Sequence, residues 1–145
     1  MRIMFDSNAF DKMISAGIDL DRIAESTKHE YFITSIQIEE LASIPDEKKE
    51  QRILNLLAMC KINARLLLTP TVVDHARIGF CVFANENDAY NDLLKCTKSN
   101  VNDAMIGSTA KRENCTVVTD DDDFSKRLAK LAIPRMTYEE FIQSL

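Results

Sequence analysis

Residues 116–125, TVVTDDDDFS, pass from a β-branched run into four consecutive aspartates, Asp120 to Asp123, and then into helix-forming residues. A strand followed at once by a helix favours a parallel α/β architecture, in which ligands bind beyond the carboxyl ends of the strands. One or two of the aspartates suit the N-cap and first turn of the next helix. The remaining like charge suits a divalent cation, provided that carboxylates from elsewhere in the fold join it.

The same order of strand and helix recurs along the whole chain. Strands are predicted at 2–5, 31–34, 64–70, 115–119 and 132–136. Helices are predicted at 8–17, 18–27, 35–44, 46–63, 71–83, 88–98, 100–114, from the aspartate run to 129, and after 137. Thr34 with Gln37 and Thr137 with Glu140 form capping boxes at two helix starts. This alternation predicts a three-layer α/β/α fold around a central, mostly parallel sheet of four to five strands.

The size of the chain predicts one compact domain. It has 145 residues, of which 46% are hydrophobic, and this is enough to bury a core without disulfides or a structural metal. No apolar run approaches the length of about 20 residues needed to span a bilayer, and the N-terminus does not resemble a signal peptide. We therefore expect a cytoplasmic protein with no membrane contact.

Charge and composition exclude several classes of binding site. The formal net charge of −5 argues against a broad, non-specific nucleic-acid surface, although the local pairs Lys111/Arg112 and Lys126/Arg127 are placed to meet phosphates. The three glycines are too dispersed to form a phosphate-binding loop. The four cysteines are far apart and the two histidines lie near none of them, which argues against a zinc site.

Acidic residues at four separate positions are predicted to meet. Asp6 ends the first predicted strand and Asp121 follows another, so parallel pairing brings both to one edge of the sheet. Helical periodicity places Glu40 on the inward side of its helix, and Asp103 lies one turn before small and apolar residues. Singly, each acid is also explained by helix capping, by the helix dipole or by solvation. Together they favour a shared metal site, because buried carboxylates are rarely unpaired and no basic residue occurs in these stretches.

At this point the sequence resembles the PIN-domain proteins, in particular the toxin nucleases of VapBC-type toxin–antitoxin pairs. The resemblance covers nearly the whole chain, so one PIN-like nuclease domain over 1–145 is expected. Four segments carry it, in the order of the family: FDSNAF at 5–10, TSIQIEEL at 34–41, NDAMIGSTA at 102–110 and VVTDDDDF at 117–124.

The resemblance implies a function and a site. It implies an endoribonuclease that hydrolyses RNA phosphodiester bonds with Mg²⁺ or Mn²⁺. The implied metal-binding and catalytic acids are Asp6, Glu40, Asp103 and Asp121, with Asp123 as a second-rank ligand and with Asn8 and Thr119 as supporting residues. The aspartate run leaves open which of its four members bind the cation.

The resemblance also implies partners. PIN toxins commonly dimerise and are held inactive by an antitoxin protein, so a homodimer and a cognate antitoxin are expected. The predicted helices at 46–63 and 71–83 are candidate contact surfaces, although packing in the core explains their apolar residues equally well.

Two other functional classes compete with the nuclease. One is a catalytically silent PIN-like module that binds proteins, against which the complete set of acids argues. The other is a Mg²⁺-dependent phosphatase or receiver-like domain, since such folds also place acids at strand ends. A phosphatase needs an aspartate where Asn8 stands, and a receiver needs a lysine after a late strand, which the segment at 132–136 does not provide.

Overall fold

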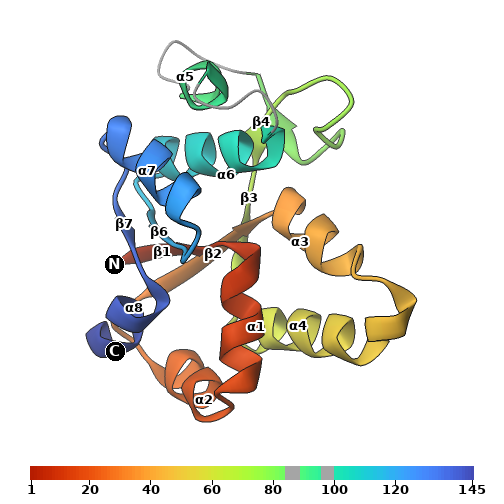
Figure 1. Ribbon diagram of the computed structural model, residues 1–145, viewed down its shortest axis with the longest axis vertical. Coiled ribbons are helices and arrows are strands. Elements are labelled where there is room, and N and C mark those ends of the chain that lie inside the picture. The colour runs from red at the N-terminus through yellow and green to blue at the C-terminus, as the bar shows by residue number, and fades with distance from the viewer. Residues whose placement is uncertain (84–88, 96–99) are drawn as a thin grey trace.

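The computed structural model describes residues 1–83, 89–95 and 100–145. Its centre is a sheet of five strands, all parallel, in the order β3-β2-β1-β6-β7 (Figure 1). The strands are β1 (Arg2–Phe5), β2 (Glu30–Thr34), β3 (Arg65–Leu67), β6 (Thr116–Val118) and β7 (Arg135–Met136). The predicted α/β fold with a parallel sheet is confirmed.

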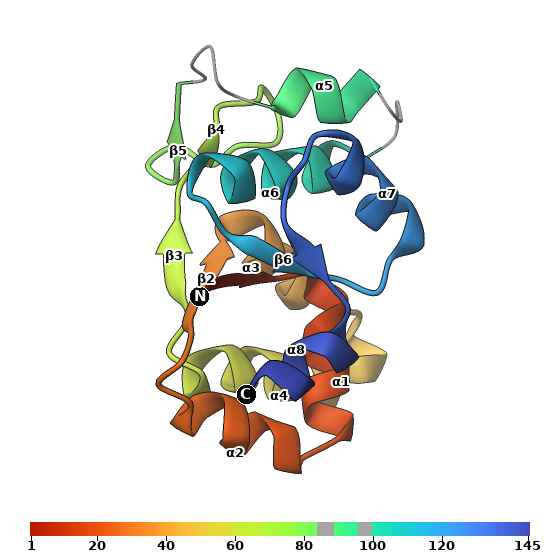
Figure 2. The same cartoon turned by 90° about the vertical axis from the view of Figure 1, so that its left-hand side faces the viewer.

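Helices cover both faces of the sheet. They are α1 (Ser7–Ser15), α2 (Ile18–Glu25), α3 (Ser35–Ala42), the 3₁₀ turn η1 (Asp46–Lys48), α4 (Lys49–Lys61), α5 (Tyr90–Lys95), α6 (Val101–Arg112), α7 (Asp122–Lys130) and α8 (Tyr138–Ser144). Figure 2 shows α1, α2, α4 and α8 on one side of the sheet and α5, α6 and α7 on the other. Among the described residues, no helix combines the length and apolar character needed to cross a bilayer.

Alternation along the strands builds two hydrophobic cores, one on each face. In β1, Ile3 and Phe5 pack into the core beneath α1, α2, α4 and α8, whereas Met4 packs into the core beneath α5, α6 and α7. In β6, Val118 and Val117 divide in the same way. This is the expected pattern for a strand buried on both faces, where successive side chains point in opposite directions.

Both predicted capping boxes are present. At the start of α3, the Thr34 backbone N–H donates to Gln37 Oε1 at 2.5 Å, and Gln37 also donates to the carbonyl oxygen of Phe5. At the start of α8, the backbone N–H of Thr137 donates to Glu140 at 2.8 Å. Because Gln37 reaches Phe5, the first capping box also ties the N-terminus of α3 to the end of β1.

The predicted helix over 71–83 is wrong. β4 (Thr69–Pro70) ends just before this segment and β5 (Cys81–Val82) lies near its end, and the two pair in parallel as a separate two-stranded sheet. The intervening chain includes Asp74 and Gly79 at φ of 64° and 88°, values that an α-helix does not contain.

The physical reason is that only Val72 and Ala76 of this segment's apolar residues pack against the core beneath α5, α6 and α7. A helix is stabilised mainly by burying one apolar face, but Val73 and Ile78 are 83% and 98% exposed. The apolar spacing in the sequence therefore predicted a buried face that the fold does not provide. Next along the chain, α5 covers the middle of the helix predicted at 88–98, whose first residue and last three lie outside the described residues.

The packing of α8 on the sheet gives a testable prediction. Phe141 is fully buried, and its ring meets that of Phe5 edge to face with centroids 5.0 Å apart. Phe141→Ala leaves a cavity there, so we expect the free energy of unfolding to fall by about 3–5 kcal/mol in urea titrations. The control is Phe83→Ala, whose side chain is 90% exposed and should change stability by less than about 0.5 kcal/mol. Equal losses in the two variants would contradict this assignment.

Candidate functional site

Five acids line one cavity at the carboxyl edge of the sheet: the four predicted site acids and Asp11 of α1. β1 and β6 are adjacent with Phe5 opposite Val118, so the residues that follow these strands lie side by side. The Asp6 backbone N–H donates to the Val118 carbonyl at 2.9 Å, which extends the pairing to the site itself. Together with helix-borne acids, these strand ends bound a cavity of about 310 Å³ whose acidic lining includes Asp6, Glu40, Asp103 and Asp121. Asn8 also lines this cavity, which we call the acidic cavity.

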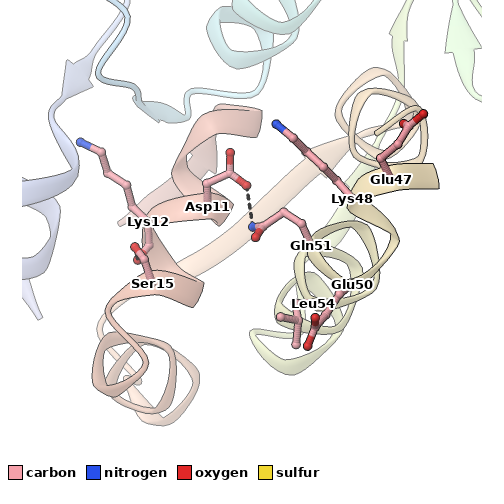
Figure 3. A pocket seen from close by; sticks show the side chains of 8 residues that line it. All are labelled: Asp11, Lys12, Ser15, Glu47, Lys48, Glu50, Gln51 and Leu54. Atoms are coloured by element: carbon pink, nitrogen blue, oxygen red, sulfur yellow. Dashed lines mark hydrogen bonds between the residues drawn. The ribbon is translucent and has the colours of Figure 1, made fainter. Parts of the chain in front are cut away.

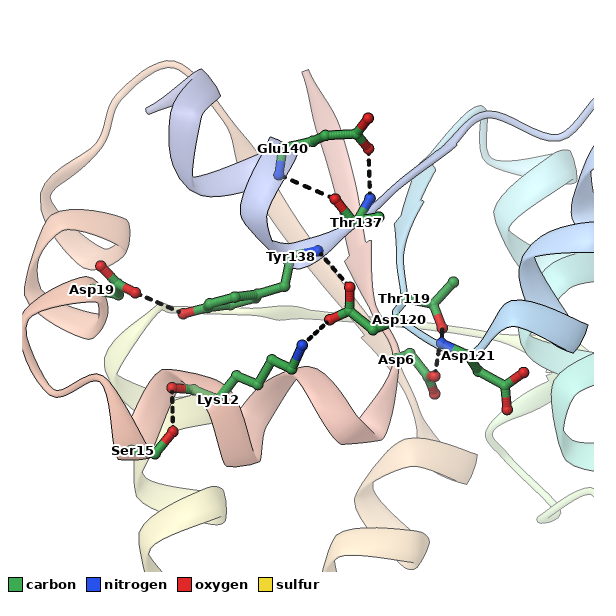
Figure 4. A network of polar contacts seen from close by, with 10 residues as sticks. All are labelled: Asp6, Lys12, Ser15, Asp19, Thr119, Asp120, Asp121, Thr137, Tyr138 and Glu140. Carbon is green, nitrogen blue, oxygen red and sulfur yellow. Dashed lines mark hydrogen bonds and ion pairs between the residues drawn. The ribbon is translucent and has the colours of Figure 1, made fainter.

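Asp6 is the most deeply buried of the four acids. Its side chain accepts hydrogen bonds from the Ser7 backbone N–H at 2.7 Å and from Thr119 Oγ1 at 2.8 Å (Figure 4). The same Thr119 hydroxyl accepts from the Asp121 backbone N–H at 3.1 Å, so it joins the two strand ends. Burial raises the pKa of Asp6 to about 6, and the charges of Asp103 and Glu40 add to the rise although Thr119 and Ser7 oppose it.

Glu40, rather than its neighbour Glu39, faces the acidic cavity, as the helical periodicity predicts. The Glu40 carboxylate accepts hydrogen bonds from Ser7 Oγ and from Asn102 Nδ2, the latter at 2.7 Å. These donors come from α1 and α6, so three helices meet at this side chain. Glu39 instead forms an ion pair with Arg77.

Asp103 has a partner that the sequence analysis missed. Arg127 of α7 is 6% exposed, and its guanidinium donates to Asp103 Oδ2. Burial raises the pKa of Asp103 in spite of the opposing effect of Arg127. A signal for this pair was present in the sequence, because Phe124, Arg127 and Leu128 have the i, i+3, i+4 spacing of a buried helix face.

Gly107 of α6 lies against side chains of both α5 and α7. A Cβ atom at Gly107, one turn after Asp103, would lie 3.1 Å from Leu128 Cδ2 and 2.9 Å from Leu93 Cδ1. Glycine therefore leaves room here for these two leucine side chains. The expectation that the Lys126/Arg127 pair meets phosphates is wrong for Arg127, because its guanidinium is buried against this carboxylate.

The four consecutive aspartates have different roles. Asp121 is the N-cap of α7 and accepts from the Phe124 backbone N–H at 2.8 Å. Asp120 points away from the acidic cavity and accepts from Lys12 Nζ at 2.7 Å and from the Tyr138 backbone N–H at 3.2 Å (Figure 4). Asp123 lies outside the residues that line the cavity; its side chain is 85% exposed and 3.5 Å from Lys126.

The donor set of the acidic cavity fits a hard divalent cation in its chemistry. Its charged lining groups are carboxylates, which Mg²⁺ and Mn²⁺ prefer to nitrogen or sulfur. As the side chains stand, however, no three acidic, histidine or cysteine residues of the described chain converge closely enough to hold an ion. Each carboxylate is instead directed at a hydrogen-bond donor of the protein, such as Thr119, Asn102 or Arg127.

Comparison with known proteins identifies the fold family. The family model described as PIN domain matches residues 3–131. The structure of VapBC-1 from nontypeable Haemophilus influenzae is similar at a TM-score of 0.57 and 15% identity, covering 96% of this chain and 99% of that chain. The structure of VapBC2 from Rickettsia felis, bound to a DNA fragment from their promoter, is similar at a TM-score of 0.58 and 17% identity, covering 94% and 98%. No curated protein sequence matches the chain significantly.

Asp120 gives a prediction that separates structural from site aspartates. Asp120→Ala removes the acceptor that ties Lys12 of α1 and the start of α8 to the end of β6. We expect a loss of about 1–2 kcal/mol in urea unfolding. Asp120→Asn keeps an acceptor oxygen for the Tyr138 N–H and loses only a partly exposed ion pair, so its loss should be below about 1 kcal/mol. An alanine variant as stable as the wild type would show that this contact contributes nothing.

The raised pKa of Asp6 predicts a pH dependence of stability in metal-free protein. The folded chain binds this proton more tightly than the unfolded chain, because the pKa is about 6 rather than 3.8. The wild type therefore loses stability as the pH rises from about 4 to about 6, and the loss is complete above that range. Asp6→Asn removes this titration while keeping an acceptor for the Ser7 N–H.

The measurement compares unfolding of both proteins in EDTA across this pH range. At about pH 7.5 we expect Asp6→Asn to be more stable by about 1–3 kcal/mol, and near pH 4 the two proteins should converge. A constant difference at all pH values would mean that Asp6 does not titrate in this range.

Proposed function

The chain belongs to the PIN domain family, and from this premise we propose that it is a Mg²⁺- or Mn²⁺-dependent endoribonuclease, the toxin of a toxin–antitoxin pair. The observation that carries the proposal is the acidic cavity, where carboxylates from two adjacent strand ends and two helices meet. The choice of RNA over DNA rests on the resemblance of the four sequence motifs to those of VapC-type nucleases.

In this proposal four of the five acids that line the cavity hold the cation, because Asp11 is engaged by Gln51 and Asn55. They are Asp6, Glu40, Asp103 and Asp121. Such a cation, when bound, supplies charge that stabilises the negative charge developing on the scissile phosphate and activates water as the nucleophile. Asp123 is a weaker candidate, because its exposed carboxylate lies outside the cavity.

The surrounding donors position these acids. Thr119 fixes Asp6 through its hydroxyl and contacts the backbone of Asp121, so one side chain sets the separation of the two strand-end acids. Asn102 holds Glu40, and Arg127 holds Asp103. Asn8 lines the same cavity and is proposed to support the acids or the substrate.

A protein partner and self-association are part of the proposal. The two similar structures are of VapBC pairs, and this chain exposes apolar side chains in both regions expected to make contacts. In α4, Ile53, Leu54 and Leu57 are 45%, 39% and 58% exposed. Between β4 and β5, Val73 and Ile78 are more exposed still. We propose that an antitoxin and a second copy of the chain cover these surfaces.

Asp103→Asn tests the nuclease directly. The substitution removes one of the four carboxylates while keeping the shape of the side chain, so cleavage of labelled single-stranded RNA in Mg²⁺ should fall by about 10²-fold or more. EDTA should abolish cleavage by the wild type. Asp122→Asn is the matched control, because Asp122 lies outside the acidic cavity, and it should cleave RNA at the rate of the wild type.

Several outcomes would contradict the proposal. Full activity of Asp103→Asn, or cleavage that survives EDTA, would remove the assigned acids or the metal from the reaction. Cleavage of single-stranded DNA in preference to RNA would correct the substrate. A wild-type protein that cleaves no RNA in Mg²⁺ or Mn²⁺ would favour the catalytically silent binding module.

A further inference from the structure

A second and larger cavity adjoins the acidic cavity. It has a volume of about 660 Å³ and lies between α1 and α4 (Figure 3). Asp11 lines both cavities, so the two adjoin at this residue. We call the larger one the α1–α4 cavity.

Asp11 is held in place by hydrogen bonds from α4. Its Oδ1 atom accepts hydrogen bonds from Gln51 Nε2 at 3.0 Å and from Asn55 Nδ2 at 2.8 Å. Asn55 is fully buried, and both amides come from α4. These bonds connect α1 to α4, and the donated hydrogens offset part of the negative charge of Asp11.

A polyanion needs a cation beside the acidic cavity, because the chain carries a net charge of −5 and the four acids repel phosphate. Lys12 and Lys48 line the α1–α4 cavity, and Arg77 lines a separate cavity beside α3. Lys12 is paired with Asp120 at 2.7 Å and Arg77 is paired with Glu39. Within the described part of the chain, only Lys48 of these three makes no ion pair.

The orientation of Lys48 suits a phosphate in the α1–α4 cavity. Figure 3 shows its amine reaching across from the α4 side toward Asp11, whereas the Lys12 amine extends in another direction. The carboxylates of Glu47 and Glu50 point to other sides of the helix than the Lys48 amine. Gln51 Nε2 already donates to Asp11 and Asn55, and Ser15 Oγ donates to the Lys12 carbonyl oxygen. Of these polar side chains of the cavity, Lys48 is therefore the donor left for a phosphate.

From these observations we propose that the α1–α4 cavity binds the sugar–phosphate segment of single-stranded RNA next to the scissile bond, with Lys48 as its phosphate contact. The inference rests on the proposed function and deepens it, because it gives the substrate a direction along the protein. In this arrangement the RNA strand passes Lys48 and then Asp11, and its scissile phosphate lies at the four proposed metal-binding acids.

The test measures binding separately from cleavage. The full-length chain with Asp103→Asn is titrated in EDTA against a short, labelled single-stranded RNA, and fluorescence anisotropy gives Kd over a series of salt concentrations. Lys48→Ala is then combined with Asp103→Asn in a second protein. The matched control combines Lys49→Ala with Asp103→Asn. Lys49 is the next residue along the chain, is also exposed, and lies outside the cavity.

We expect Lys48→Ala to make the negative slope of log K, the association constant, against log salt shallower by about 0.7. This corresponds to about fourfold weaker binding at 0.15 M salt. Lys49→Ala should change neither quantity. In the active background, Lys48→Ala should raise KM for RNA and leave kcat unchanged.

Three results would overturn the inference. They are identical salt slopes for Lys48→Ala and Lys49→Ala, absence of RNA binding by the parent protein, and tighter binding by Lys48→Ala. None depends on cleavage, so failure of this contact is distinguishable from failure of the nuclease assignment. If the wild type cleaves RNA normally and the two lysine variants bind alike, the nuclease stands and the RNA takes another path.

Discussion

Burial of carboxylates at one edge of the sheet is the constraint on which the site depends, and their mutual repulsion adds to its cost. Parallel pairing of β1 and β6 forces Asp6 and Asp121 together, and burial makes the charged form of Asp6 costly enough to raise its pKa to about 6. Hydrogen-bond donors on α1, α6, α7 and at the end of β6 contact these acids. The same hydrogen bonds that make the acids tolerable also fix where they stand.

The run from Asp120 to Asp123 shows how the fold distributes a dense local charge. Asp121 faces the acidic cavity and caps α7, whereas Asp120 turns the other way and connects α1 to α8. Asp122 and Asp123 begin α7, where the helix dipole favours acids. Successive residues at a strand end point to opposite sides, so only part of such a run can face one site. The number of consecutive aspartates in a run therefore says little about how many of them can face one cation site.

Several basic side chains already form ion pairs with acids of the same chain. Arg77, Lys12 and Arg127 are each in ion pairs, and the last of these is buried. With a net charge of −5, this pairing leaves few basic side chains for the proposed contact with RNA, which is therefore placed in a small region rather than over a face. The identities of 15% and 17% with the two VapBC structures, beside TM-scores of 0.57 and 0.58, show a shared fold.

The sequence alone determined the alternation of strands and helices, both capping boxes and four of the five acids that line the cavity. Each of these depends on residues close together in the chain or on the rule that parallel strands end at one edge. Tertiary structure alone decided the partner of Asp103, which is Arg127 at a separation of 24 residues, and the partner of Asp120, which is Lys12 at a separation of 108. It also decided that 71–83 is not a helix, since whether an apolar face is buried depends on what packs against it. Spacing within one segment carries no information about which distant side chain will meet it.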